Sequence, residues 1–211
     1  MLDILITKAL EECRTLPIVA SAFDRLRREL PHSLTYHAYA HSEDVFEETI
    51  RFAVIGGLHP REVELLAVAA AFHDAGFIST PKENEPLAAE LALSEMGTSG
   101  GYRSNECALV KQMILDTALK KAQDGLRQHA TTPLSGYLLD ADLSNLGRDD
   151  FFEKGELQRR ENDSDEATFW IAALSLIKSH RWNTPGARAM RARKQLRNID
   201  ILEQRIRKGE S

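Results

Sequence analysis

Tyr36-His37-Ala38-Tyr39-Ala40-His41 is the segment from which the organisation of this chain can be inferred. His37 and His41 are four residues apart, so on a helix both imidazoles project from the same face. Paired imidazoles at this spacing are typical of a site that binds a metal or moves a proton.

Two later segments carry side chains of a similar kind, Phe72-His73-Asp74 and Ala141-Asp142. His73 and Asp74 are adjacent and cannot share a face within a helix, but they can converge on one point where a helix ends, and Gly76 favours such an end. Two imidazoles and two carboxylates suit Mn, Fe, Ni, Co or Zn. The sequence therefore predicts a divalent-metal site to which these three segments contribute imidazoles and carboxylates.

Helical periodicity dominates the chain, and no segment shows the alternation that is typical of a strand. Residues 65–72 are apolar nearly all round, which predicts a central buried helix that ends at His73-Asp74. Residues 120–132 are polar and predict a mobile loop. We expect an all-α fold, a helical bundle with the metal site between core helices. Helices are predicted over residues 2–14, 17–30, 39–55, 61–73, from about 85 to 97, and over 103–121, 133–147, 166–181 and 185–208.

Length and composition limit the classes of protein to which this chain can belong. A chain of 211 residues fits a single domain, which we expect over residues 1–211 with its core at about 30–182, N-terminal helices at 1–30 and a basic helix at 183–211. The net charge of −5 disfavours nucleic-acid binding, which needs a basic surface. Two isolated cysteines exclude a disulfide framework. Without a signal peptide or an apolar run of about 18 residues, a cytoplasmic protein that binds no membrane is expected.

These motifs resemble the HD-domain superfamily of metal-dependent phosphohydrolases. Tyr36-His37-x-x-x-His41 is similar to the opening motif of the cyclic-nucleotide phosphodiesterases in that superfamily. A branch of small bacterial predicted HD phosphohydrolases is more similar still, since it has an Asn-Glu like Asn84-Glu85 and a Leu-Asp-Ala-Asp-Leu-x-x-Leu-Gly like residues 139–147. The resemblance covers residues 30 to 165, and it implies an HD-type helical bundle.

The resemblance also implies individual roles. Its metal-ligand positions fall on His41, His73, Asp74 and Asp142, and Asp74 would bridge the cations if two bind. His37 matches a histidine that protonates the leaving oxygen, a role suited to its ordinary pKa of about 6.5. The alternative for His37 is that it only orients His41.

Two aspartates compete for the last ligand position, because Asp140 and Asp142 both stand in Leu-Asp-Ala-Asp-Leu. Residues two apart on a helix point about 200° apart, so both cannot reach one metal. The resemblance selects Asp142, and Asp140 would then support the site or cap a helix.

Four further residues match the branch with less direct roles. Asn84 and Glu85 suit a contact to substrate or to a ligand, although a helix N-terminus with favourable charge explains them as well. Thr117 matches a threonine of the branch, but lysines follow it where a histidine is expected. Residues 159–161 are similar to an Arg-Glu pair of the branch, which implies a contact between Arg160 and a substrate phosphate.

The leading hypothesis is a phosphohydrolase that cleaves a phosphomonoester or phosphodiester, of a nucleotide, with metal-activated water. His37 and Asp74 would be catalytic, and one or two ions of Mn, Ni, Fe, Zn, Co or Mg would be the cofactor. The alternatives are a catalytically silent nucleotide-sensing or regulatory HD domain and a di-iron HD-type oxygenase, for which too few ligands can be assigned. The substrate, the formation of a homo-oligomer and the role of the arginine-rich C-terminal helix stay open; that helix is a solvated face, a packing arm or a partner surface.

Overall fold

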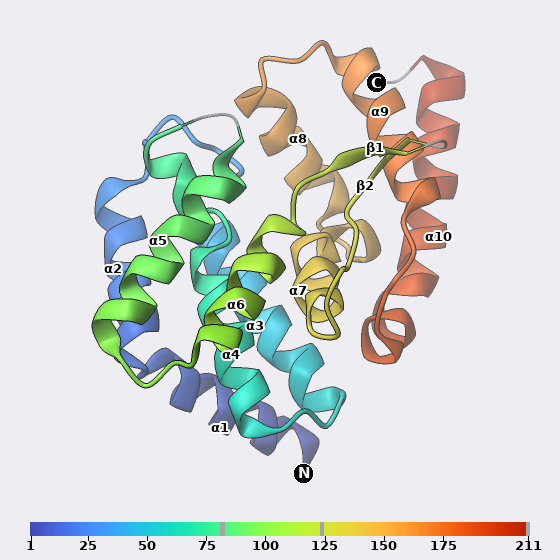
Figure 1. The fold of residues 1–211 in the computed structure, drawn as a ribbon. Coiled ribbons are helices and arrows are strands. Elements are labelled where there is room, and N and C mark those ends of the chain that lie inside the picture. The colour runs from blue at the N-terminus through green and yellow to red at the C-terminus, as the bar shows by residue number, and fades with distance from the viewer. Residues whose placement is uncertain (81–82, 123–124, 210–211) are drawn as a thin grey trace.

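Helices make up nearly all of the regular structure, which confirms the predicted all-α bundle (Figure 1). The computed structural model describes residues 1–80, 83–122 and 125–209. Its helices are α1 (Leu2–Arg14), α2 (Pro17–Glu29), α3 (Tyr39–Ile55), α4 (Pro60–Phe72), α5 (Asn84–Ser99), α6 (Ser104–Leu115), α7 (Ser135–Asp142), α8 (Phe151–Glu161), α9 (Glu166–Ser179) and α10 (Pro185–Lys208). Two short 3-10 turns, η1 (Ala75–Ile78) and η2 (Ser144–Gly147), follow α4 and α7.

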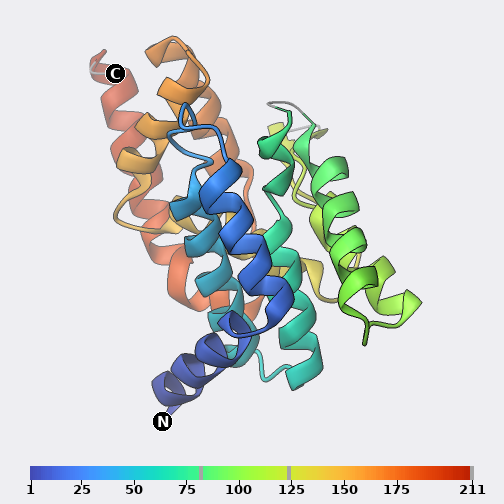
Figure 2. The same ribbon diagram turned by 90° about the vertical axis from the view of Figure 1, so that its left-hand side faces the viewer.

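Helix α4 is the centre of the bundle, as its apolar sequence predicts. The side chains from Leu66 to Ala71 are fully buried. Helices α2, α3, α5 and α6 pack around α4. Figure 2 shows α5 and α6 on one side of α2 to α4, and α8 to α10 on the other. The end of α4, which carries His73, is therefore held from several directions.

Proline sets the start of three helices. Pro17, Pro60 and Pro185 each stand in the first turn of their helix, where the missing N–H removes no intrahelical bond. The bounds of α1, α3 and α10 agree with the predicted ranges.

The segment predicted as a mobile loop contains a short antiparallel hairpin instead. Strands β1 (Lys120–Ala122) and β2 (Gly125–Arg127) pair with Lys120 opposite Arg127. Helix α6 also ends at Leu115, six residues before the predicted end at residue 121. Its end is fixed by Asp116, whose buried carboxylate accepts hydrogen bonds from the backbone N–H (2.8 Å) and hydroxyl (2.8 Å) of Thr131. Asp116 thus ties the chain that returns from the hairpin to the end of α6.

None of the described helices has both the length and the apolar character that crossing a membrane requires.

Candidate metal centre

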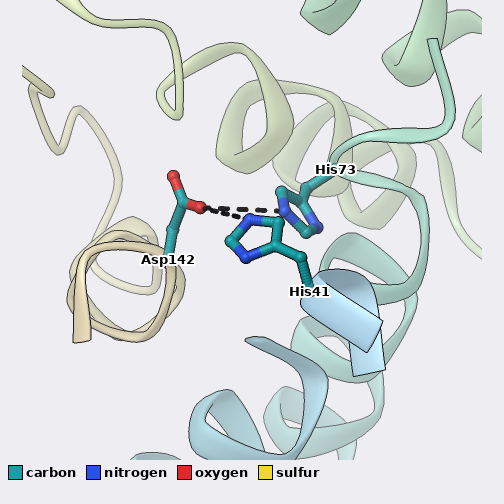
Figure 3. A group of neighbouring side chains, drawn as sticks. All are labelled: His41, His73 and Asp142. Atoms are coloured by element: carbon teal, nitrogen blue, oxygen red, sulfur yellow. Dashed lines mark ion pairs between the residues drawn. The ribbon is translucent and has the colours of Figure 1, made fainter. Parts of the chain in front are cut away.

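Three helices direct polar side chains to one point (Figure 3). His41 lies in the first turn of α3, His73 is the residue at which α4 ends, and Asp142 is the last residue of α7. Asp74 directly precedes η1, so the adjacent pair stands at a helix end, as the sequence predicts. Figure 3 shows the two imidazoles and the Asp142 carboxylate turned toward one another.

The distances between these groups match a ligand shell. His41 Nε2 lies 3.4 Å from Asp74 Oδ2 and 3.3 Å from Asp142 Oδ1. His73 Nε2 lies 3.2 Å from the same Asp74 oxygen and 3.8 Å from the same Asp142 oxygen. Ligand atoms about 2.1 Å from a tetrahedral cation are about 3.4 Å apart. His41, His73 and Asp142 together could therefore hold a metal ion, and Asp74 borders the same point.

The buried atoms at this point also fit a cation. His73 Nε2 and Asp74 Oδ2 are buried and form an ion-pair contact with each other at 3.2 Å, but neither atom makes a hydrogen bond within the described residues. Leaving such atoms unsatisfied is costly, and a cation bound to both removes that cost. His73 Nδ1 donates to the carbonyl of Ala70 at 2.8 Å, which turns Nε2 toward the point of convergence.

The carboxylates at the centre stabilise a positive charge placed among them. Burial alone would lower the pKa of His73, but the carboxylates of Asp74 and Asp142 raise it above its usual value. Burial alone would raise the pKa of Asp74, but the histidines around it hold that pKa well below its usual range. The carboxylate is therefore ionised, and a cation that binds here competes with a proton on the imidazoles.

His37 lies beside this centre and is held by Glu161. The His37 Nδ1 hydrogen-bonds to Glu161 Oε1, and the other oxygen of that carboxylate accepts from the backbone N–H of Tyr36 (2.7 Å) and of His37 (3.0 Å). The imidazole stacks on Phe77 with ring centres 4.4 Å apart, and its ring centre lies 5.7 Å from that of His41. Burial alone would lower the pKa of His37, but the Glu161 carboxylate and the nearby aspartates raise it.

Gln128 is a residue at the centre that the sequence did not reveal. Its Nε2 donates to Asp142 Oδ2 and to the carbonyl of Thr117 (2.8 Å), which leaves the other Asp142 oxygen toward the histidines. Thr117 thus reaches the centre through its backbone and Gln128, while its hydroxyl donates to Ile114 at 2.7 Å. Gln128 lies in the polar segment 120–132, for which the sequence predicts a loop. No local pattern in that segment marks Gln128 as a residue of a site.

The two competing aspartates have different surroundings. The buried Asp140 carboxylate accepts hydrogen bonds from the backbone N–H and side-chain amide of Asn183 (2.8 and 2.9 Å). It also accepts from the backbone N–H and hydroxyl of Thr184 (2.7 and 2.8 Å), at the start of α10. Asp140 therefore anchors α10, while Asp142 is the aspartate beside the histidines.

The other residues matched by resemblance lie outside the group of ligands. Asn84 is the buried first residue of α5, and a Cβ added to Gly76 would meet its carbonyl oxygen at 2.0 Å, so only glycine fits there. Glu85 is half-buried in the first turn of α5. Arg160 is exposed and bonds to Glu156 at 2.8 Å, and it is Glu161, the next residue, that contacts His37.

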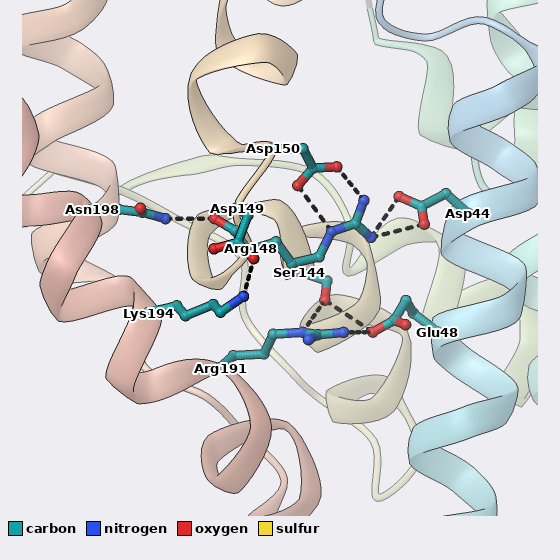
Figure 4. Close-up of polar contacts among 9 residues, drawn as sticks. All are labelled: Asp44, Glu48, Ser144, Arg148, Asp149, Asp150, Arg191, Lys194 and Asn198. Carbon is teal, nitrogen blue, oxygen red and sulfur yellow. Dashed lines mark hydrogen bonds and ion pairs between the residues drawn. The ribbon is translucent and has the colours of Figure 1, made fainter. Parts of the chain in front are cut away.

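Charged side chains join α3 to the segment that follows Asp142 (Figure 4). Arg148 Nη1 lies 2.8 Å from both carboxylate oxygens of Asp44. Arg191 of α10 donates to Ser144 Oγ at 2.7 Å and pairs with Glu48 of α3. Through Arg191 the arginine-rich helix acts as a packing arm that holds α3, which carries His41, against the segment that follows Asp142.

No protein-family model matches the chain, and no curated protein matches it. A crystal structure of a structural-genomics target from Lactobacillus plantarum is similar to it, with a TM-score of 0.64. The two share 14% sequence identity over 90% of this chain and 95% of the other. This likeness shows the fold alone.

Replacing His73 with Ala should abolish metal binding, because it removes a buried ligand that packing holds in place. His32→Ala is the matched control, since His32 is exposed and is not one of the residues that converge on the centre. Elemental analysis of the purified proteins should find metal in the wild type and the control only. Stoichiometric metal in His73→Ala would contradict the ligand assignment.

Asp140→Ala should lower the free energy of unfolding by about 3 kcal/mol, because it leaves buried donors at the start of α10 without an acceptor. Urea denaturation of the variant and wild type measures this. The folded Asp140→Ala protein should keep its metal. A stable variant without metal would show that Asp140, and not Asp142, is the ligand.

Proposed function

We propose that this protein is a metal-dependent phosphohydrolase of the HD type that cleaves a phosphomonoester or phosphodiester bond of a nucleotide. The observation that supports this most is the convergence of His41, His73, Asp74 and Asp142, with two of their atoms buried and unsatisfied. Two imidazoles with two carboxylates form a donor set suited to Mn, Fe, Ni, Co or Zn. The sequence resemblance gives the class of reaction.

Different residues of the chain would bind the cation and orient the water. His41 and His73 would bind a cation through Nε2, and Asp142 through Oδ1. When bound, such a cation supplies a water of lowered pKa and positive charge for the phosphoryl oxygens. Asp74 is ionised, so its carboxylate can accept a hydrogen bond from the attacking water and orient it.

His37 and Glu161 fit the transfer of a proton to the leaving group. Glu161 engages Nδ1 of the imidazole, so Nε2 is the nitrogen left to face a substrate. As water adds to phosphorus and the bond to the leaving oxygen breaks, the Nε2 proton would pass to that oxygen. Glu161 acts through His37 and is a positioning residue.

Glu161→Gln should lower kcat on an alkyl phosphate ester by about 10²-fold, because the imidazole loses the carboxylate that orients it. On the p-nitrophenyl ester the loss should be less than about tenfold, since nitrophenolate leaves without a proton. Metal content, measured in parallel, should not change. Equal losses on both esters would remove His37 as the acid.

Hydrolysis of nucleotides by the metal-loaded protein tests the function itself. Wild type reconstituted separately with Mn²⁺, Ni²⁺, Fe²⁺ or Zn²⁺ should release phosphate from a nucleoside monophosphate or open a cyclic nucleotide. His73→Ala should retain under about 1% of that rate, because it lacks the cation that activates water. Nucleotide binding without turnover in every metal form would contradict an enzyme and favour a sensor domain.

A further inference from the structure

A small hollow adjoins the candidate metal centre on the side of the hairpin. Its volume is about 170 Å³, and it lies between the end of β2 and the connection from α9 to α10. Sites for drug-sized ligands hold roughly 300–1,000 Å³, so this hollow fits one group of a small molecule. Its polar lining consists mainly of Arg127, Gln128, His129, His180, Arg181 and Asn183.

Two arginines bring positive charge to the lining of the hollow. Arg127 approaches from β2 and Arg181 from the segment after α9, where Arg181 Nη1 already donates to the carbonyls of Lys178 (2.7 Å) and His180 (2.9 Å). None of the described residues that line the hollow is acidic. Burial, with the charges of Arg181 and Arg127, lowers the pKa of His180 to about 4. His180 is therefore neutral at physiological pH, and both guanidinium groups act on the space around it.

Two residues of the hollow's lining carry buried polar atoms that lack a hydrogen-bond partner within the described residues. His180 is 8% exposed, and its Nε2 makes no hydrogen bond within the described residues. The same holds for Oε1 of Gln128. Guanidinium groups match the geometry of phosphate oxygens, while a neutral imidazole and an amide oxygen can bind a hydroxyl or a protonated phosphate oxygen.

Gln128 connects this hollow to the metal centre. Its side chain lines the hollow, and its Nε2 donates to the Asp142 carboxylate. Leu143, the residue after Asp142, also lines the hollow. A ligand in the hollow is thus one side chain away from the group that would bind the cation.

We propose that this hollow binds a second phosphate of the substrate, so that the protein acts on a small molecule that carries two phosphates. The part of this inference that concerns turnover rests on the proposed function. The part that concerns the binding of an anion by Arg127 and Arg181 is independent of the proposed function.

Calorimetric titration of the full chain, as purified, with inorganic phosphate tests the anion site. Arg127→Gln and Arg181→Gln should each weaken binding by about tenfold, because each removes a charge-assisted hydrogen bond. Arg193→Gln, which removes an exposed arginine of α10 outside the hollow, should bind phosphate as the wild type does. Arg181 is exposed too, so its variant should keep the fold even where Arg127→Gln does not.

His73→Ala separates the hollow from the metal centre in the same titration. Phosphate binding should persist in this variant, because the hollow contains none of the candidate ligands. The inference is overturned if His73→Ala loses phosphate binding while Arg181→Gln keeps it. It is also overturned if Arg193→Gln weakens binding as much as Arg181→Gln.

Turnover tests the substrate class. Metal-loaded wild type should prefer adenosine 3′,5′-bisphosphate over adenosine 5′-monophosphate by at least about tenfold in kcat/KM, and Arg181→Gln should lose this preference. Hydrolysis of both with equal kcat/KM in wild type and variant would overturn the inference and leave the proposed function standing. Hydrolysis of neither, with phosphate still bound in an arginine-dependent way, would overturn the proposed function and leave the anion site standing.

Discussion

The structure depends on the way the end of α4 is fixed. This helix is buried on nearly all sides, so its last residues cannot shift without disturbing the whole bundle. His73 Nδ1 is bound to the carbonyl of Ala70, one turn earlier, and Nε2 is thereby aimed at a buried point beside Asp74. An imidazole nitrogen and a carboxylate oxygen buried there need a partner, and His41 and Asp142 are placed around the same point.

Polar side chains outside the apolar core keep His41 and Asp142 in position. Arg148 and Arg191 tie α3, which carries His41, to the segment that follows Asp142. Gln128 donates a hydrogen bond to one oxygen of the Asp142 carboxylate, and Glu161 hydrogen-bonds to the imidazole of His37. Glu161 at the end of α8 and Gln128 just after β2 thus act on the candidate site through single side chains. Helix α10 holds α3 through Arg191, and the apolar core fixes α4.

Local sequence pattern was sufficient where the structure is set by periodicity, proline and neighbouring residues. The buried α4 and the helical His41 followed from such patterns, and so did the His73-Asp74 pair at a helix end. Gln128 and Glu161 could not be found this way, because they meet their partners across 14 and 124 residues of chain. The early end of α6 likewise depends on the contact of Asp116 with Thr131, which periodicity does not record.

The central claim is that at least one divalent cation binds between α3, α4 and α7. Anomalous diffraction from crystals of the Mn²⁺- or Zn²⁺-loaded protein, collected at the absorption edge of the metal, tests it most directly. The account predicts a single strong peak, or two adjacent peaks, about 2.0–2.3 Å from Nε2 of His41 and His73 and from an oxygen of Asp142. A fully loaded protein with its anomalous peak elsewhere, or with none at this point, would contradict it.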